Sequence, residues 1–322
     1  MKAIVQDAYG GADALRFTEV DVPVPGPDDV LIKVFAATVH AGDVHLTTGL
    51  PLVARPAIGM RGPRNRIRGT DVAGVVEAVG ERVTAFRPGD AVFGVARGAF
   101  AEHAVAQAKL LARKPANTSF AQAAALPTSG STALDAVRGR VAPGTRVVVT
   151  GAGGGVGSFV VRLAKAAGGH VTGVCGPRNT ELVLANGADE VIDYTRAGLP
   201  DGGADLLVEL AGNRSIGTLR RALAPRGTLV VAGGESDSRW LGPERRALVA
   251  MLLSPFVGQT LRGLLSLVSE KSMRELAGLL ADGTLVPVLD REFALADTAQ
   301  AIAHLMAGQA RGKVVITVVE EV

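Results

Sequence analysis

The chain has 322 residues, of which 48% are hydrophobic and 20% are charged, and its formal net charge is +3. This composition is typical of a globular protein, and the length predicts two domains. The small net charge gives no support for a nucleic-acid partner, and no apolar run is long enough to span a membrane. With no secretion signal at the start, we expect a cytoplasmic protein. A single cysteine, Cys175, excludes an internal disulfide and a cysteine-rich zinc lobe.

Residues 1–120 are predicted to be β-rich. The segments Val30 to Val34 and Val72 to Val79 are typical of strands, and prolines and glycines separate such segments. Short strands with frequent turns predict a small barrel or sandwich. The most basic stretch, Arg61 to Arg68, contains no aromatic residue; it is either a solvated loop or a route for an anionic ligand.

From about residue 130 the pattern changes to alternating strands and helices. We expect strands at 146–150, 170–174, 188–194, 204–210 and 227–233. Helices are expected between them, for example at 214–224, closed by Pro225-Arg226-Gly227. This alternation predicts a doubly wound parallel sheet.

The segment from Arg146 to Gly157 predicts a dinucleotide-binding turn. A β-branched run leads into a glycine cluster, and an apolar helical pattern follows. Glycine lets the backbone N–H groups approach a diphosphate with no Cβ in the way, and the helix N-terminus adds unpaired donors. A flexible glycine-rich loop is the alternative, but the flanking strand and helix favour the cofactor site.

The end of the next strand indicates which cofactor binds. An NAD site carries an acidic residue about 20 residues after the glycines, where it binds the ribose 2′-OH. Here the sequence is Cys175-Gly176-Pro177-Arg178-Asn179, with no acid before Glu181. Because an arginine binds a 2′-phosphate through charge-assisted hydrogen bonds, we predict NADPH. The alternative is that Arg178 is only a solvated turn residue.

The remaining chain is predicted to be mainly helical at 235–284 and to return to β structure at Val286 to Phe293. A helix is expected from about Asp297 to Gly308, with a final strand from Lys313 to Val319.

Short motifs are spread over nearly the whole chain. In chain order they are Met1-Lys2-Ala3, Tyr9-Gly10-Gly11, Ala36-Ala37 with His40 and Asp43, Gly69-Thr70-Asp71-Val72-Ala73-Gly74, Arg87-Pro88-Gly89-Asp90, Gly98-Ala99-Phe100-Ala101-Glu102, Ala123-Ala124-Ala125-Leu126-Pro127, Gly130-Ser131-Thr132-Ala133, the 151–157 turn, Gly187-Ala188-Asp189, and Gly312-Lys313-Val314-Val315-Ile316. Each motif is common, but the set in this order is specific. It resembles the medium-chain dehydrogenases/reductases of the zinc-free, quinone oxidoreductase (zeta-crystallin-like) branch.

The resemblance implies an α/β protein with two domains. A GroES-like β-barrel substrate domain would comprise residues 1–122 and 286–322, and a Rossmann domain with a doubly wound parallel sheet would comprise residues 123–285. The active site would lie in the cleft between them. Relatives commonly form homodimers by joining the sheet edges of their nucleotide domains, and residues 226–233 are expected to be internal to that sheet.

The resemblance also implies the cofactor contacts. Thr132 matches the threonine near the nicotinamide carboxamide, and Lys313 matches a lysine near the cleft, although it could instead be a surface lysine. The diphosphate turn comprises Gly151, Gly153, Gly154, Gly155, Val156 and Gly157. The 2′-phosphate and adenosine pocket comprises Gly173, Arg178 and Tyr194, and Gly233 and Gly234 run beside the cofactor.

Zinc-dependent relatives carry a cysteine where His40 stands and a His-Glu pair where Thr70-Asp71 stands. Only His40 could bind a metal here, so we expect none. Zinc-free relatives usually carry asparagine at this position. His40 is therefore a candidate catalytic residue that donates a proton or hydrogen bond to a developing oxyanion. Alternatively, it only bonds Asp43 or a backbone carbonyl and shapes the pocket.

The resemblance implies an NADPH-dependent, zinc-independent oxidoreductase that transfers a hydride to a quinone or an α,β-unsaturated carbonyl. Its partner would be a small apolar electron acceptor. One alternative is an enoyl-thioester reductase, although the segment Gly49-Leu50-Pro51-Leu52 lacks the catalytic tyrosine that such enzymes often carry. The other alternative is a non-catalytic NADPH-binding protein with a structural or regulatory role.

Overall fold

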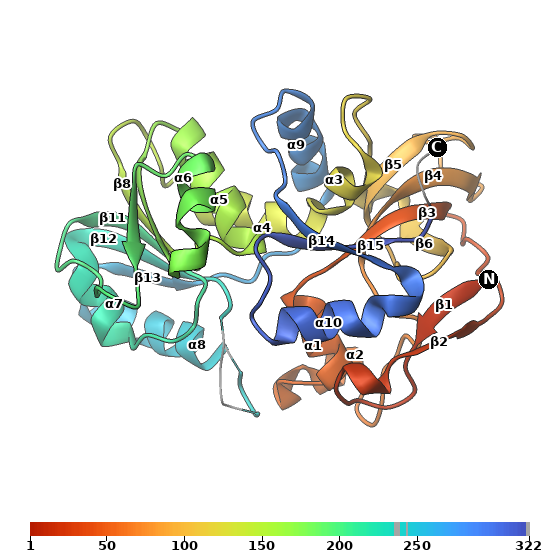
Figure 1. The fold of residues 1–322 in the computed structure, drawn as a ribbon, viewed down its shortest axis with the longest axis horizontal. Coiled ribbons are helices and arrows are strands. Elements are labelled where there is room, and N and C mark those ends of the chain that lie inside the picture. Colours follow the sequence, from red (N-terminus) through yellow and green to blue (C-terminus); the bar gives the residue numbers. More distant parts are fainter. Residues whose placement is uncertain (235–238, 243, 320–322) are drawn as a thin grey trace. The chain divides into compact units, whose positions relative to one another are not determined.

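Two units with different sheets make up the chain in the computed structural model, which describes residues 1–234, 239–242 and 244–319 (Figure 1). The first unit comprises Met1–Ser131 and Val268–Val322, and the second comprises Thr132–Leu267. The predicted α/β architecture with two domains is therefore confirmed. The predicted domain boundaries fall before helix α4 (Pro127–Val137) and after helix α9 (Glu270–Ala281), whereas the two units divide within α4 and before α9.

The first unit is built on a mixed sheet that contains the central strand β3 (Asp29–Val39), in which β14 pairs parallel with β15 and the other pairs are antiparallel. The sheet order is β14-β15-β3-β4-β5-β7, β6 also pairs with β3, and β1 pairs with β2 separately. The other strands are β1 (Lys2–Val5), β2 (Arg16–Glu19), β4 (Asp71–Val79), β5 (Ala91–Val95), β6 (His103–Gln107), β7 (Leu111–Arg113), β14 (Leu289–Ala294) and β15 (Lys313–Thr317). Because β15 pairs antiparallel with β3, with Val314 opposite Val39, the C-terminal segment joins the N-terminal sheet as the resemblance implies.

Short helices cover the ends and sides of this sheet. They are η1 (Ala12–Ala14), α1 (Ala41–Thr48), η2 (Leu52–Ala54), α2 (Arg55–Ile58), η3 (Ala108–Leu110), α3 (Phe120–Ala124), the first turn of α4, α9, η6 (Leu295–Asp297) and α10 (Thr298–Met306). The core of the unit is apolar and includes Ile32, Val34, Phe100 and Ile316. Its burial stabilises the sheet that positions the polar cluster described below.

The second unit has a parallel six-stranded sheet in the order β10-β9-β8-β11-β12-β13. The strands are β8 (Arg146–Thr150), β9 (His170–Cys175), β10 (Glu190–Asp193), β11 (Ala204–Glu209), β12 (Leu223–Val231) and β13 (Thr260–Gly263). Between them lie α5 (Gly155–Ala166), η4 (Pro177–Asn179), α6 (Thr180–Ala185), α7 (Ile216–Ala222), α8 (Glu244–Leu253) and η5 (Ser254–Phe256). The chain runs from β8 through β9 to β10 on one side of the sheet, and from β11 through β12 to β13 on the other. Right-handed crossovers therefore place α5 and α6 on one face of the sheet and α7 and α8 on the other face (Figure 1).

The doubly wound parallel sheet is therefore confirmed, as is the internal position of β12, but three details were wrong. The helix predicted at 214–224 ends at Ala222, and Pro225 to Gly227 lie within β12. They occupy a register shift between β11 and β12, where the missing N–H of the proline breaks no regular ladder. The region 235–284, predicted as helical, contains the strand β13, and its residues 235–238 and 243 lie outside the described residues. Strand β14 begins at Leu289, after the predicted start at Val286.

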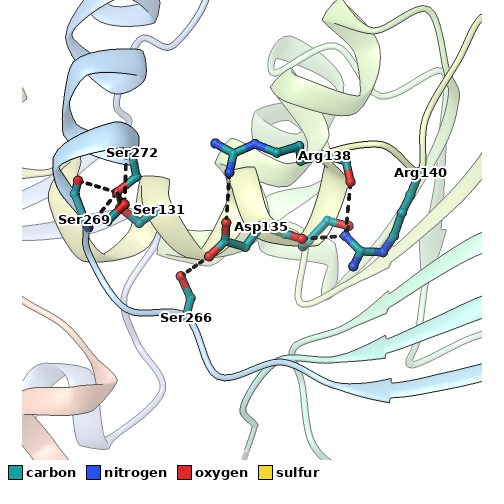
Figure 2. A network of polar contacts seen from close by, with 8 residues as sticks. Ser131, Asp135, Arg138, Arg140, Ser266, Ser269 and Ser272 are labelled. Atoms are coloured by element: carbon teal, nitrogen blue, oxygen red, sulfur yellow. Dashed lines mark hydrogen bonds and ion pairs between the residues drawn. The ribbon is translucent and has the colours of Figure 1, made fainter.

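Polar side chains line the two places where the chain passes from one unit to the other (Figure 2). In the first unit, Ser131 Oγ on α4 donates to Ser272 Oγ on α9 at 3.2 Å. In the second unit, Ser266 Oγ donates to Asp135 Oδ2 on α4 at 2.7 Å. Each of these two hydrogen bonds lies within one unit, and together they involve α4 residues on either side of the division between Ser131 and Thr132.

Candidate active site

The glycine-rich turn of the second unit joins β8 to α5. Gly151 has a φ of +65°, which a side chain rarely adopts. A Cβ on Gly157 would lie 2.1 Å from the Gly151 carbonyl oxygen, so α5 can start this close to the turn only with glycine there. Gly154 is the N-cap of α5 and no side chain caps the helix. The N–H groups of Gly155, Val156 and Gly157 thus begin an uncapped helix, which suits a diphosphate.

Asn179 lies beside this turn and was missed by the sequence analysis. A Cβ on Gly153 would lie 2.7 Å from the Asn179 Cβ, so the asparagine packs directly on the turn. Its Oδ1 atom is buried and has no hydrogen-bond partner in the part of the chain that the structure describes. Since buried polar atoms normally have partners, an unpaired oxygen next to the glycine turn is consistent with a bound nucleotide. The turn and its surroundings therefore fit a dinucleotide cofactor.

Arg178 and Tyr194 lie in the segments that follow β9 and β10. Arg178 is exposed in η4, and no described residue pairs with its guanidinium. Tyr194 is 53% exposed, and its hydroxyl would lie 3.3 Å from a Cβ placed on Gly176. Both side chains thus stand at the carboxyl edge of the parallel sheet, where open α/β sheets bind ligands.

The remaining predicted cofactor residues of the second unit have different surroundings. Gly233 and Gly234 follow β12 with φ angles of +100° and +115°, and Thr132 is half-buried in α4. Gly173 is packed in the interior, where a Cβ would lie 2.3 Å from Val183 Cγ1 on α6. A Cβ at Gly173 would also lie 3.2 Å from the Ala152 Cβ of the glycine turn, so packing against α6 and against the turn explains the absence of a side chain.

A buried carboxylate, Glu209, fixes the strand ends next to the glycine turn. Thr150 Oγ1 donates to Glu209 Oε2 at 2.9 Å, and the Gly212 N–H donates to Oε1 at 2.7 Å. The Leu210 N–H also donates to Thr150 Oγ1 at 3.0 Å. The direction of the strand order reverses between the neighbouring strands β8 and β11, and folds of this kind bind nucleotides at that point. Glu209 therefore stabilises the strand ends at this position.

In the first unit, sheet pairing brings together polar residues that are far apart in sequence. His40 follows β3, Thr70 and Asp71 stand at the start of β4, and Lys313 starts β15. Strands β15, β3 and β4 are neighbours, with Thr38 opposite Asp71 and Val39 opposite Val314. The first turn of α4 adds Thr128 and Ser129. We call these residues and Asp43 the His40 cluster.

His40 is held in one tautomer by its hydrogen bonds. The Gly42 N–H donates to His40 Nδ1 at 3.0 Å, so the imidazole caps helix α1 through its unprotonated nitrogen. The other nitrogen, Nε2, must then carry the hydrogen. It lies 2.8 Å from Thr70 Oγ1 and 3.4 Å from Asp43 Oδ2. The His40 N–H also donates to Asp43 Oδ2 at 3.0 Å, so the interaction with Asp43 that the sequence analysis left open is present.

Asp71 and Lys313 form the buried base of the cluster. Thr128 donates to the Asp71 carboxylate from its hydroxyl at 2.5 Å and from its N–H at 3.2 Å. Lys313 Nζ donates to Ser129 Oγ at 3.0 Å and lies 4.0 Å from Asp71 Oδ2. Lys313 is only 2% exposed, so the alternative of a surface lysine is wrong. Burial lowers the pKa of the Lys313 ammonium and raises the pKa of the Asp43 carboxyl.

Comparisons with known proteins agree with this arrangement. Residues 26–116 match the alcohol dehydrogenase GroES-like domain family, and residues 186–316 match the family described as zinc-binding dehydrogenase. A chloroplastic quinone oxidoreductase of Triphysaria versicolor is 33% identical over 98% of both chains. The chain belongs to the quinone oxidoreductase branch of the medium-chain dehydrogenases/reductases. As a member of this branch, it is an oxidoreductase.

Two further relatives of this branch match over nearly their full length. The mouse quinone oxidoreductase is 32% identical, and the match covers 98% of this chain and 97% of the mouse protein. The quinone oxidoreductase structure from Coxiella burnetii superimposes with a TM-score of 0.88 at 28% identity, over 99% of both chains. The first relative is chloroplastic by name, so the cytoplasmic location of this quinone oxidoreductase homologue stays a prediction. Within the described ranges, every helix is too short or too polar to cross a membrane.

The name of the second matched family includes zinc, but the donors around His40 do not fit a catalytic zinc site. Nδ1 of His40 is bonded to Gly42, and both Asp71 oxygens accept hydrogen bonds from Thr128. The Lys313 ammonium beside Asp71 would also repel a cation. Among the described residues, no three His, Cys, Asp or Glu side chains are placed to hold a metal ion.

The Arg61 to Arg68 stretch of this branch member divides into two environments. Arg61, Arg64 and Arg66 are exposed, in agreement with a solvated loop. Arg68 is only 6% exposed, and its Nε and Nη2 atoms have no hydrogen-bond partner. The position of Arg68 therefore could not be inferred from the loop as a whole.

A cavity of about 810 Å³ also lies in the first unit, away from the His40 cluster. Arg82 and Arg113 line it but are already paired with Asp28 and Asp90. The glycine turn and the His40 cluster therefore remain the candidate sites of this oxidoreductase.

Proposed function

We propose that this oxidoreductase uses NADPH to reduce a quinone or an α,β-unsaturated carbonyl compound, and that it does so without zinc. The proposal is supported most directly by the exposed, unpaired Arg178 next to the glycine turn, where an NAD-preferring protein would carry an acid. The names of the relatives support a quinone as the acceptor. The donor set around His40 supports chemistry without a metal.

Each cofactor contact follows from one part of the second unit. The backbone of Gly151 to Gly157 would hold the diphosphate at the start of α5, and Arg178 would bind the 2′-phosphate with Tyr194 beside the adenosine. Asn179 would contribute its unpaired oxygen. Thr132 would bind the carboxamide, and the backbone of Gly233 and Gly234, whose φ angles favour glycine, would run beside the cofactor.

The bound nicotinamide supplies the hydride, so the protein needs only to position the acceptor and stabilise the charge that develops on its oxygen. The His40 cluster is suited to the second task because it presents hydrogen-bond donors from a rigid sheet. His40 acts there as a neutral hydrogen-bond donor, since its Nδ1 has no hydrogen to give. Lys313 stays a predicted cofactor contact, and its ammonium donates to Ser129 and lies near Asp71.

We also propose a homodimer that forms through β13, the free edge of the parallel sheet. Several apolar side chains next to this edge are exposed, including Phe256, Leu265 and Leu267. A second copy would cover them and pair the edge strand. An enoyl-thioester reductase or a non-catalytic binding protein has no such specific support.

The test is NADPH consumption by the purified protein against a panel of quinones, enones and enoyl thioesters, monitored by the loss of NADPH absorbance. The expected result is turnover with quinones or enones and little with enoyl thioesters. Turnover confined to enoyl thioesters would overturn the proposed acceptor, and NADPH binding without turnover on any acceptor would overturn the enzymatic function.

A further inference from the structure

We propose that Thr70 is the side chain that hydrogen-bonds the reacting oxygen of the acceptor, and that His40 is a positioning residue that fixes the Thr70 hydroxyl. This inference rests on the proposed function and names the atom that would act within the His40 cluster. It separates two roles for His40, proton donor and hydrogen-bond donor, that the sequence could not distinguish.

The hydrogen bonds of His40 leave it no proton to release. Nδ1 accepts from the Gly42 N–H at 3.0 Å, so the ring carries its hydrogen on Nε2. Losing that hydrogen would turn the neutral imidazole into an anion beside the Asp43 and Asp71 carboxylates, which approach Nε2 at 3.4 and 3.8 Å. An imidazolium would need a hydrogen on Nδ1, directed at the Gly42 N–H. His40 is therefore a hydrogen-bond donor, and it donates to Thr70 Oγ1 at 2.8 Å.

The ring of His40 is also fixed in orientation. The Gly42 N–H contacts one edge, while Asp43 from α1 and Asp71 from β4 lie near the other. The facing cation, Lys313 on β15, donates to Ser129 and lies 4.0 Å from Asp71 Oδ2. Turning the ring would break the cap of helix α1 and the bond to Thr70 together.

Thr70 has a hydroxyl hydrogen that remains available. Because its oxygen accepts from His40, its own hydrogen must point to a different acceptor. Among the described residues, no protein atom accepts that hydrogen. By contrast, the Thr128 hydroxyl donates to Asp71 and the Thr38 hydroxyl to the Ala124 carbonyl. Thr70 and His40 are both partly buried, and the His40 side chain is 12% exposed, so neither residue is enclosed in the core.

The chemistry balances without a proton from the protein. The hydride brings two electrons to the acceptor, and the charge that develops on the acceptor oxygen receives a hydrogen bond from the Thr70 hydroxyl. His40 strengthens that bond by donating to the same threonine oxygen, as in other hydrogen-bond chains. The one proton that completes the hydroquinone or ketone comes from solvent water, and Thr70 and His40 keep theirs.

The first test compares turnover of Thr70→Val, Thr70→Ser, His40→Asn and the control Thr18→Val, a half-buried threonine on β2. Thr70→Val should lower kcat by about 10²-fold, the usual loss of one oxyanion donor, with the KM for NADPH unchanged. Thr70→Ser and His40→Asn should stay within about 10-fold of the wild type, because a hydroxyl or an amide N–H replaces each lost donor. Wild-type turnover in Thr70→Val would overturn the inference.

The pH profile supplies a readout that a purely structural role would not change. The profiles of the wild type and His40→Asn should have the same shape, because no histidine proton is transferred. A fall in wild-type kcat through the usual histidine range, absent from His40→Asn, would identify His40 as the acid and overturn the inference.

The second test needs no turnover and so remains valid if the proposed function fails. Nitrogen NMR of the histidine rings, with the His40 signals assigned by their loss in His40→Asn, should show hydrogen on Nε2 and none on Nδ1 at neutral pH. Thr70→Val should shift only the Nε2 signal. Hydrogen on Nδ1 would overturn the inference even in an active enzyme, whereas a wild type inactive on every acceptor would overturn the proposed function alone.

Discussion

Lys313 Nζ and Asp71 Oδ2 lie 4.0 Å apart in the interior of the first unit, one at the start of β15 and the other at the start of β4. Replacing Lys313 by Met should destabilise the protein by about 3–5 kcal/mol, because the Asp71 carboxylate loses its buried counter-charge. Lys33→Met, at an exposed position of β3, should have little effect. Urea unfolding of the three proteins at neutral pH measures the difference.

The same pair predicts a pH dependence. Burial lowers the pKa of Lys313 below its ordinary value of 10.5, so the unfolded chain binds more protons than the folded chain between the two values. The stability of the wild type relative to Lys313→Met should therefore increase as pH rises through that window. A constant difference across the alkaline range would show that Lys313 is not desolvated.

Arg178 should set the cofactor preference. Arg178→Ala should weaken NADPH binding by about 10-fold to 100-fold, the usual cost of losing a charge-assisted hydrogen bond, and leave NADH binding unchanged. Arg245→Ala, an exposed arginine on α8, serves as the control. Fluorescence titration with both cofactors gives the affinities, and equal losses for NADPH and NADH would contradict the assignment.

The edge strand β13 should be the dimer contact. Leu265 and Leu267 follow it with exposures of 86% and 75%. The wild type should have the mass of a dimer in sedimentation at micromolar concentration, and the double variant Leu265→Lys, Leu267→Lys that of a monomer. Val24→Lys, equally exposed in the first unit, should remain dimeric. A monomeric wild type would rule the dimer out.

Gly173 should act through packing with Val183. Gly173→Ala should destabilise the protein by about 1–3 kcal/mol, because the new Cβ would lie 2.3 Å from Val183 Cγ1. In the double variant, Val183→Ala should recover part of the lost stability. The stability change of the double variant, measured by thermal unfolding, should therefore be smaller than the sum of the two single changes. NADPH affinity of the folded single variant should stay at the wild-type level; a selective loss of affinity would instead support the contact implied by the family.

Cys175 should be an unreactive thiol. It is 3% exposed at the end of β9, and burial raises its pKa, so the thiolate is scarcer than in an ordinary cysteine at any pH below that pKa. Alkylation by iodoacetamide at pH 8 should be slow in the native protein and fast in guanidinium chloride. Equal rates in the two conditions would show that the thiol is accessible.

The sequence predicted the second unit well because its signals are local. Strands β8, β9, β11 and β12 contain short apolar runs, α5 has an apolar period, and the glycine turn lies within twelve residues. Strand β13 was missed because its four residues, Thr260 to Gly263, are too few to show a period. Its pairing is decided by β12, which no local pattern reports.

The His40 cluster could be predicted only in part. Family position indicates His40, but the partners of its ring come from α1 and from the start of β4, and the residues around Asp71 come from β15 and α4. Only the fold brings these segments together. Burial of Lys313 depends on the same arrangement. Arg68 was treated together with the exposed arginines of the same stretch, because no neighbouring residue in the sequence indicates that Arg68 is buried.

Glu209 adds an evolutionary consequence. Its carboxylate spans the distance between the Thr150 hydroxyl and the Gly212 N–H, and an aspartate, shorter by one methylene, could not satisfy both from the same backbone position. A lone change at position 209 would leave buried donors unpaired beside the nucleotide turn. Positions 150 and 209 should therefore change together among descendants of this protein, because the Thr150 hydroxyl is the side-chain partner of the Glu209 carboxylate.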